Sequence, residues 1–325
     1  MLIRPRRNRV SRAVRNLVRE SSLSAPDLVL PLFVHEADVD SPIASMPGVS
    51  RAGIAATVAK ARVAASLGIR AVALFPALSD ALKDPSARES VNPDGLNQRC
   101  IRALRAALPD IAVISDVAMD PYSSDGHDGV VRDGRIVNDA TLPILAAMAV
   151  SQARAGADVV APSDMMDGRV RAIREALDAA GFPDVLICSY CVKYASAFYG
   201  PFRDALDSAP RAGDKKTYQM DPANAREALR EVALDEGEGA DWLMIKPGLP
   251  YLDIVRLVRG QTALPVVAYH VSGEYAMLKA AAEKGWIDYD RCLMESLIAF
   301  KRAGADLIFT YAAIDAARLI SGRSG

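Results

Sequence analysis

The sequence predicts an α/β fold, a (β/α)8 TIM barrel with an extended N-terminal arm, and three observations lead there. Eight short apolar runs are distributed along the 325 residues, Ala-rich amphipathic stretches separate most of them, and several of these stretches end in a Gly directly before the next run. Apolar strands that alternate with helices indicate a parallel sheet, and eight such units indicate a closed barrel. The alternative is a doubly wound open sheet, which the lack of a G-x-G-x-x-G motif after the first run disfavours.

The predicted strands are apolar along nearly their whole length, as is typical of strands covered on both faces. In chain order they are LVLPLFV (28–34), AVALFPAL (71–78), IAVISDV (111–117), ADVVAPS (157–163), VLICSYCVK (185–193), WLMIK (242–246), PVVAYHVS (265–272) and DLIFTYA (306–312). Helical patterning covers residues 54–68 and 142–157, among other segments. Gly68, Gly156 and Gly304 each stand just before a predicted strand, where Gly is the common end of a helix.

Two segments lie outside this alternation. Residues 1–25 precede the first strand and form an arm that carries seven arginines. Residues 26–325 form one catalytic barrel, although length alone would also allow two domains. Within the barrel domain, residues 196–222 are rich in Pro, Gly and charge, and we expect them to act as an active-site lid.

The charge balance excludes several classes of partner. Lysine plus arginine number 39 and aspartate plus glutamate number 40, which disfavours general binding to nucleic acid or to a membrane. The Arg-rich arm could contact RNA, but docking on a neighbouring subunit fits better because the rest of the chain has no basic excess. Four cysteines are few for this length and indicate a reducing compartment, so we expect a cytoplasmic protein. The C-x-x-C of Cys188 and Cys191 is expected in the core.

Lysines end two neighbouring predicted strands, where a barrel places its catalytic groups. Lys193 ends the fifth run, and Lys246 ends the sixth, between an apolar stretch and Pro-Gly. Adjacent strands lie about 4.8 Å apart, so both amines reach one cavity. Burial and repulsion between the two ammonium groups favour neutral amines, which attack carbonyls and form Schiff bases. The alternative for each lysine is a snorkelling side chain or an ion pair. The pair indicates lysine-dependent carbonyl chemistry without identifying a substrate.

At these residues the chain closely resembles the δ-aminolevulinic acid dehydratase family, over nearly its whole length. The motifs that carry the resemblance are RPRRNR (4–9), APSDMMDGRV (161–170), SYCVKYASAFYGPFRDA (189–205), TYQMDPAN (217–224), MIKPG (244–248) and VSGEYAM (271–277). The resemblance implies a hydro-lyase of tetrapyrrole (heme) biosynthesis that condenses two 5-aminolevulinate molecules to porphobilinogen. Lys193 and Lys246 would each hold one molecule as a Schiff base. The alternative is another class I Schiff-base enzyme of the aldolase type.

The resemblance also implies which residues hold the substrate. One carboxylate would be bound by Arg203, Lys215 and Gln219, and the other by Ser272 and Tyr311. Many family members carry Arg where this chain has Lys215, so the charge is kept but the bidentate fork is lost. Two further residues would contact a substrate amine or a Schiff-base nitrogen, namely Asp116 and Ser163. Taken alone, Ser272 and Tyr311 would be read as ordinary capping or core residues.

Metal binding is expected to differ between two places. Zinc-dependent members carry three cysteines where this chain has Ala118, Asp120 and Asp128, so we expect no zinc. The two aspartates could hold a hard cation such as Mg²⁺, or K⁺, or none. Nearby His127 is expected to be a polar loop residue. Glu231 corresponds to an allosteric site where water-held Mg²⁺ supports a homo-octamer or a smaller hexamer; the alternative is a solvated glutamate that pairs with Arg230.

Overall fold

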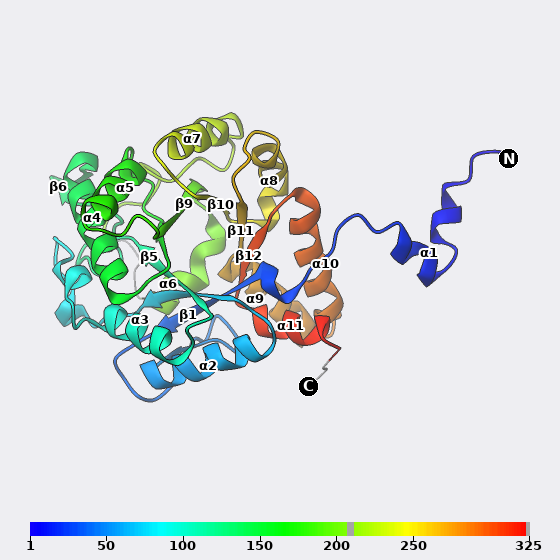
Figure 1. Cartoon of the computed structure of the whole chain (residues 1–325), viewed down its shortest axis with the longest axis horizontal. Helices are drawn as coiled ribbons and strands as arrows, with labels where there is room; N and C mark the ends of the chain where they lie inside the picture. The colour runs from blue at the N-terminus through cyan, green and yellow to red at the C-terminus, as the bar shows by residue number, and fades with distance from the viewer. Residues whose placement is uncertain (207–210, 323–325) are drawn as a thin grey trace.

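The structure, a computed structural model, describes residues 1–206 and 211–322 (Figure 1). Eight parallel strands form a barrel, and its last strand pairs with its first. In chain order these are β1 (Leu28–Val34), β4 (Ala71–Pro76), β5 (Ala112–Val117), β8 (Val159–Pro162), β9 (Leu186–Lys193), β10 (Trp242–Lys246), β11 (Val266–His270) and β12 (Leu307–Thr310). The closure of the barrel confirms the predicted fold and rules out the open sheet.

Each barrel strand lies within the run predicted for it, and β1 and β10 have the predicted bounds. The seventh run, 265–272, is longer than its strand because a helix begins at Ser272. Glu274, in the first turn of that helix, accepts the backbone N–H of Val271 at 2.8 Å. A carboxylate at the third helical position stabilises a helix start in this way, so the apolar pattern continues beyond the point where the strand ends.

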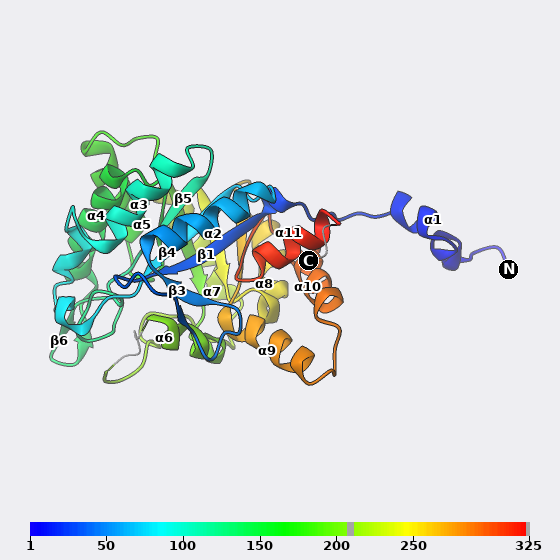
Figure 2. The ribbon, with the colours of Figure 1, turned by 90° about the horizontal axis from the view of Figure 1, so that it is seen from below.

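Helices surround the barrel (Figures 1 and 2). They are α2 (Ile54–Ser66), α3 (Leu96–Ala107), α4 (Asn138–Ala155), α5 (Arg169–Ala179), α6 (Gly200–Leu206), α7 (Arg226–Gly237), α8 (Leu252–Arg259), α9 (Ser272–Glu283), α10 (Tyr289–Ala303) and α11 (Ala313–Ile320). Gly156 and Gly304 stand at the ends of α4 and α10 with φ of 105° and 115°. This left-handed conformation suits Gly, and it confirms that glycines end these helices as predicted.

Several short elements complete the fold. The brief strands are β2 (Ser41–Pro42), β3 (Ser50–Ala52), β6 (Val131–Arg132) and β7 (Arg135–Ile136), and the 3₁₀ turns are η1 (Pro5–Arg9), η2 (Ala25–Asp27), η3 (Asp80–Leu82), η4 (Arg88–Val91), η5 (Ala197–Tyr199) and η6 (Leu249–Tyr251). Of these, β3 extends the barrel sheet by pairing in parallel with β1.

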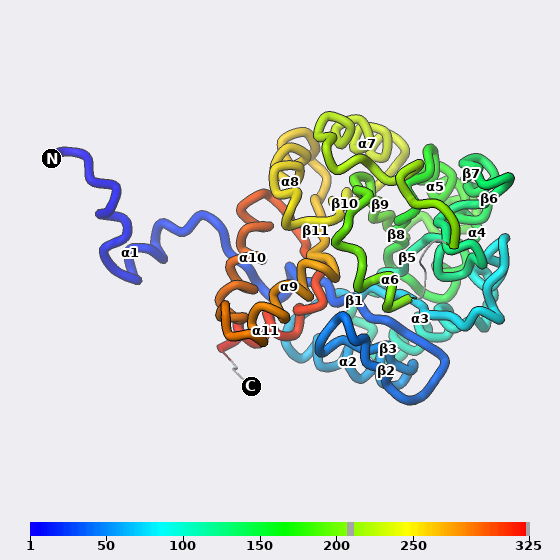
Figure 3. The backbone as a smooth tube through the Cα atoms, turned by 180° about the vertical axis from the view of Figure 1, so that it is seen from behind, coloured from blue at the N-terminus to red at the C-terminus, as the bar shows by residue number. Residues whose placement is uncertain are grey.

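The N-terminal arm projects away from the barrel (Figures 2 and 3). It contains η1 and α1 (Arg12–Leu17), and the first buried residue of the chain is Ala25, in η2. Apolar side chains of the arm are exposed, with Leu2 at 90% and Leu17 at 84%. The arm packs on the barrel core through Leu23 and Ala25 at its end, and the exposed apolar surface before them is available for another molecule.

The two cysteines of the C-x-x-C motif are buried in the core of the barrel. Cys188 and Cys191 lie on β9, and both are free and buried. Burial raises the pKa of both thiols, which keeps them protonated and unreactive. The prediction that this C-x-x-C belongs to the core is therefore confirmed. Within the described ranges, no helix is both long enough and apolar enough to cross a membrane.

The two described parts of the predicted lid, residues 196–206 and 211–222, contact the ends of the strands that carry the lysines: the Tyr199 hydroxyl donates to the carbonyl of Lys246 at 3.0 Å, and the backbone N–H of Met220 donates to the carbonyl of Lys193 at 2.9 Å. The first part consists of η5 and α6, and the second part runs from Arg211 toward α7 without regular secondary structure. Four residues of the predicted lid, 207–210, lie outside the described residues, as do 323–325 at the end of the predicted barrel domain.

Candidate active site

Lys193 and Lys246 lie opposite each other at the carboxyl ends of β9 and β10. Only 6% of Lys193 and 5% of Lys246 is exposed. Both strands are apolar up to the lysine, so the packing that buries each strand also carries its amine into the interior. The strand register agrees with the prediction that the two lysines end neighbouring strands.

Aromatic rings surround the amine of Lys246. Its Nζ lies 4.5 Å from the ring centroid of Tyr269, 4.8 Å from Phe202, 5.1 Å from Tyr190 and 5.4 Å from Tyr199. Burial first, and the charge of Lys193 second, lower the pKa of Lys246 to about 7. Since an ordinary lysine stays charged at neutral pH, this shift makes a large fraction of the amine neutral and nucleophilic there.

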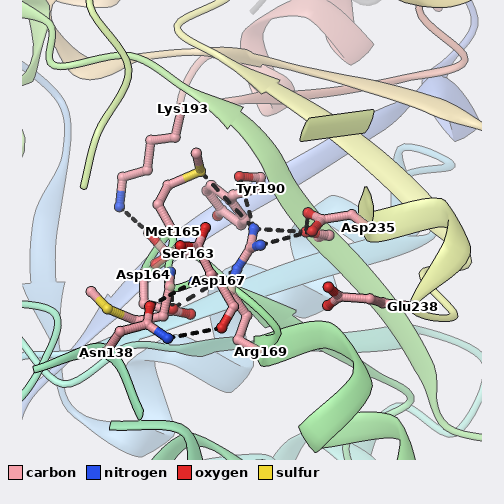
Figure 4. Close-up of polar contacts among 12 residues, drawn as sticks. Asn138, Ser163, Asp164, Met165, Asp167, Arg169, Tyr190, Lys193, Asp235 and Glu238 are labelled. Carbon is pink, nitrogen blue, oxygen red and sulfur yellow. Dashed lines mark hydrogen bonds and ion pairs between the residues drawn. The ribbon is translucent and has the colours of Figure 1, made fainter. Parts of the chain in front are cut away.

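The amine of Lys193 lies beside β8 and β9. Its Nζ donates a hydrogen bond to the backbone carbonyl of Ser163, a contact drawn in Figure 4. The Tyr190 ring, which also faces Lys246, has its centroid 5.9 Å from this nitrogen. Tyr190 therefore contributes to the surroundings of both amines.

Asp116, near the end of β5, is a buried acid whose pKa both lysines affect. Burial and the charge of Asp120 raise its pKa to about 7, although Lys193, Lys246 and a hydrogen bond from Ser163 act in the opposite direction. A carboxyl group with this pKa can both donate and accept a proton near neutral pH. Its position and its pKa suit proton transfer at a carbon atom or nitrogen atom held by the lysines.

Lys215 and the two loop aspartates form one ion cluster, which the sequence did not predict. The Nζ of Lys215 lies 3.1 Å from Asp120 Oδ2 and 3.0 Å from Asp128 Oδ2. Burial alone would raise the pKa of Asp128, but Lys215 lowers it to about 2. Burial and the charge of Asp128 raise the pKa of Asp120.

This cluster bears on two expectations, that the loop aspartates hold a hard cation or none, and that Lys215 binds a substrate carboxylate. The ammonium group occupies the space between the carboxylates of Asp120 and Asp128, so this pair does not fit a bound Mg²⁺ or K⁺ in this arrangement. Lys215, in turn, is already paired with two acids and is not the free cation that a substrate carboxylate was expected to meet. The physical reason for this pairing is that a buried ammonium group needs carboxylates close to it, including carboxylates from distant parts of the chain.

The remaining predicted substrate residues differ in their surroundings. Ser272 Oγ accepts the backbone N–H of Phe202 at 3.0 Å, so it holds the lid helix α6. The hydroxyl groups of Tyr311 and Tyr269 lie 3.1 Å apart. Gln219 is buried, and its Oε1 has no hydrogen-bond partner in the part of the chain that the structure describes. Arg203 is exposed on α6.

The second part of the lid is docked on the loop after β5. His127 donates from Nε2 to the carbonyl of Ala212 at 2.9 Å, and its Nδ1 lies 3.2 Å from the Tyr218 hydroxyl group. The backbone N–H of Arg211 bonds the carbonyl of Asp125 at 3.1 Å. His127 is thus a polar loop residue, as expected, and it also fastens the lid. A cavity of about 1050 Å³ lies against this part of the lid, and neither active-site lysine is among its lining residues.

An adjoining acidic cavity of about 370 Å³, which shares Asp167, Glu227 and Glu231 with the first, lies between α5 and α7. It is lined by Asp167, Gly168, Arg169, Glu227, Arg230, Glu231, Leu234, Asp235 and Glu238. Burial and the nearby Asp235 raise the pKa of Glu231 to about 7. No three His, Cys, Asp or Glu side chains in the described ranges form a cluster that could hold a metal by themselves.

Buried Arg169 connects this cavity to the active site (Figure 4). Its guanidinium donates to Asp235 Oδ1 at 2.8 Å and to Ser189 Oγ at 3.0 Å. Ser189 lies on β9, the strand that ends in Lys193, and Asp164 lies 3.8 Å from the same guanidinium. Sequence reasoning missed this network, although the Arg of the quoted motif, next to the end of a buried strand, was a usable signal.

The fold and the site together define a lysine-dependent barrel enzyme that acts on a carbonyl compound. A family profile described as Delta-aminolevulinic acid dehydratase matches residues 2–319. Chloroplastic dehydratases of that name are 58% identical in Glycine max and 59% in Oryza sativa subsp. japonica, each over 324 residues. These matches cover 98% of this chain and 78% and 75% of those proteins.

A crystal structure of delta-aminolevulinic acid dehydratase (porphobilinogen synthase) from Toxoplasma gondii, in complex with the reaction product porphobilinogen, superposes with a TM-score of 0.97. It is 57% identical, and the match covers 98% of this chain and 92% of that one. The chain belongs to the delta-aminolevulinic acid dehydratase family. The predicted family, barrel and dehydratase activity are thereby confirmed, and the family match excludes the aldolase alternative.

One prediction is overturned by the same relatives. The cytoplasmic location expected from the sequence is wrong by this comparison, since the dehydratases of Glycine max and Oryza sativa subsp. japonica are named chloroplastic. Scarce cysteine indicates a reducing environment, but it does not distinguish one reducing compartment from another.

Proposed function

We propose that this dehydratase joins two molecules of 5-aminolevulinate to porphobilinogen while Lys193 and Lys246 each hold one molecule as a Schiff base. The observation that carries the proposal is the direct pairing of the two buried amines across β9 and β10. Two buried amines on neighbouring strand ends would allow both ketones to be activated at the same time and in a fixed mutual orientation.

The residues around the amines supply the other requirements of imine chemistry. The neutral amine of Lys246 attacks a ketone, and the resulting carbinolamine loses water when its hydroxyl group is protonated. Asp116, whose pKa is about 7, is the acid placed to provide that proton. Tyr190, Tyr199, Phe202 and Tyr269 keep water from the imine on Lys246 and so protect it from hydrolysis.

Two groups of residues would bind the substrate carboxylates. Ser272 and Tyr311 would provide hydroxyl groups for one carboxylate, where Ser272 Oγ now donates to the Phe198 carbonyl at 3.4 Å, and Arg203, Lys215 and Gln219 lie in the predicted lid. Lys215 is paired with Asp120 and Asp128. If it also bound a substrate carboxylate, its ammonium group would be shared among three carboxylates. Replacing Lys215 by Ala should therefore raise KM while each Schiff base still forms.

The acidic cavity at Glu231 supports a regulatory role. We propose that it takes a hydrated Mg²⁺ and that the occupied site favours the larger assembly of the chain, a homo-octamer over a hexamer. The carboxylate of Glu231 is partly buried near Asp235 with a raised pKa, so a divalent cation would relieve a repulsion that is already present. The exposed arm, residues 1–25, would provide the contacts between subunits.

Borohydride reduction in the presence of 5-aminolevulinate, followed by peptide mass spectrometry, tests the dual Schiff base. Adducts at both Lys193 and Lys246 are expected in the wild-type enzyme. Variants in which either lysine is replaced by Met should lose porphobilinogen formation, measured colorimetrically, while they retain the adduct at the other lysine. An adduct at one lysine only, in wild-type enzyme that forms the pyrrole, would contradict the proposal.

A further inference from the structure

Arg51 makes a two-pronged contact with the end of the lid helix. It lies on β3, and its Nε donates to the carbonyl of Ala205 at 2.5 Å while its Nη2 donates to the carbonyl of Asp204 at 2.5 Å. Both carbonyls belong to the last described turn of α6 (Gly200–Leu206). A planar guanidinium fork suits two neighbouring acceptors, and its positive charge suits the negative end of the helix dipole.

The other end of α6 is fixed as well. The backbone N–H of Phe202 donates to Ser272 Oγ at 3.0 Å. Between these two attachments, the ring of Phe202 has its centroid 4.8 Å from Lys246 Nζ. The same ring packs against Phe33 at 5.7 Å and Phe75 at 5.5 Å. The position of α6 therefore decides whether Lys246 is covered by an apolar ring or by water.

The base that carries Arg51 is part of the barrel itself. In the pairing of β3 with β1, Arg51 is the direct partner of Phe33. Phe33 is also one of the rings on which Phe202 rests. Arg51 thus holds the backbone of α6, and its strand partner Phe33 packs on the side chain of Phe202. Both contacts come from strands of the barrel sheet rather than from loops, so we expect them to be rigid.

We propose that Arg51 is a positioning residue of the dehydratase, which clamps α6 over Lys246 and keeps water away from the amine during imine formation. This inference rests on the proposed role of Lys246. It assigns a function to the β2–β3 hairpin, which precedes the lid by about 150 residues and also accepts the Tyr275 hydroxyl at the carbonyl of Pro47 at 2.6 Å.

The test compares two substitutions that remove similar contacts. Arg51→Met keeps the apolar stem and removes the fork at the lid. Arg174→Met is the matched control, because Arg174 donates to the carbonyls of Val185 and Phe182 at 2.8 and 3.0 Å, on the loop between α5 and β9. The first readout is the pH dependence of kcat/KM for pyrrole formation.

In Arg51→Met, water reaches Lys246, and the midpoint of the rise in kcat/KM with pH should move upward by about one pH unit. One unit corresponds to about a tenfold loss below the midpoint. At pH 9 the variant should be within about twofold of wild type, since the amine is then neutral in both. Arg51→Lys should show a smaller shift. Arg174→Met should leave the midpoint unchanged, whatever its effect on stability.

A second readout does not depend on pyrrole formation. Levulinate, a simple keto acid, is trapped on Lys246 with borohydride at each pH and quantified by peptide mass spectrometry, and trypsin cleavage after Arg203 and Arg211 reports lid opening. Arg51→Met should shift the trapping midpoint and be cleaved faster than Arg174→Met. Equal trapping midpoints and equal cleavage rates in both variants would overturn the role of Arg51. If wild type trapped levulinate but made no pyrrole, the proposed function would fail instead.

Discussion

Lys193 and Lys246 are direct partners across the parallel pair β9 and β10. The barrel fixes the Cα positions of the two lysines relative to each other, and both side chains extend from these fixed points into the interior. The surroundings of the two amines differ. Lys246 is enclosed by four aromatic rings, whereas Lys193 donates a hydrogen bond to the carbonyl of Ser163, the residue after β8. We therefore expect the two amines to differ in their reactivity toward a ketone.

The burial of Lys246 should cost stability in a pH-dependent way. Its pKa is about 7 in the folded protein, against about 10.4 in an unfolded chain. Between these values the unfolded state binds more protons, so wild-type stability due to this group rises with pH. Lys246→Met should therefore have a higher Tm than wild type at pH 6, with the advantage shrinking toward pH 10. Lys284→Met, at an exposed position after α9, is the control, and a pH-independent advantage of Lys246→Met would contradict the account.

The cluster of Lys215 with Asp120 and Asp128 should be a net requirement for folding. Lys215→Met leaves two buried carboxylates without their cation, which should cost about 3 kcal/mol of unfolding free energy at pH 7. Lowering the pH to about 5 should recover part of the loss, because protonation removes the unpaired charge. Urea unfolding at the two pH values measures this effect.

The neighbouring lysine offers a matched control for that experiment. Lys216 pairs with Asp214 at 3.6 Å, and both side chains are exposed. An exposed ion pair contributes little, so Lys216→Met should unfold like wild type. If Lys215→Met also unfolded like wild type at pH 7, the ion cluster would not be holding the loop after β5 to the lid.

Magnesium should act through Glu231 on the size of the assembly. Sedimentation velocity with Mg²⁺ and with EDTA should show a shift from the larger to the smaller particle when the metal is removed. Glu231→Gln should give the smaller particle in both conditions, because the neutral amide cannot hold the cation. Glu236→Gln, an exposed glutamate of α7 outside the cavity, should respond to Mg²⁺ as wild type does, and a metal response retained by Glu231→Gln would refute the assignment.

Arg169 should be needed for both stability and catalysis. It is 2% exposed and paired with Asp235, so Arg169→Met leaves a buried carboxylate and should cost about 3–5 kcal/mol. Since the same guanidinium holds Ser189 on β9, kcat should fall even under conditions where the variant is fully folded. Arg171→Met, exposed on the same helix, controls for the loss of a helical arginine. Full kcat in folded Arg169→Met would show that the Arg169 network does not contribute to catalysis.

The sequence was sufficient for the features that depend on neighbours along the chain. The apolar runs predicted every barrel strand, and Lys193 and Lys246 stood out because each ends such a run. The order of strands in a barrel then placed the two amines together. Helix ends at Gly156 and Gly304 followed from the conformational freedom of Gly alone.

Features that depend on contacts between distant segments were not predictable in this way. Lys215 is 95 positions from Asp120, and nothing in the sequence near Lys215 shows that two acids will surround it. Arg51 is 154 positions from Ala205, and its bonds go to backbone carbonyls, which leave no pattern of residue types. The location of the protein was missed for a different reason, since composition reports the redox state of a compartment and not its identity.

The pH dependence of Schiff-base trapping at Lys246 in the wild-type enzyme tests the central claim most directly. Levulinate and borohydride are applied from pH 5 to pH 11, and the fraction of Lys246 modified is measured by peptide mass spectrometry. The account predicts a midpoint near pH 7, in keeping with a pKa lowered by burial and by Lys193. A midpoint near the ordinary lysine value of about 10.4 would contradict it, because the amine would then be hydrated and charged at neutral pH.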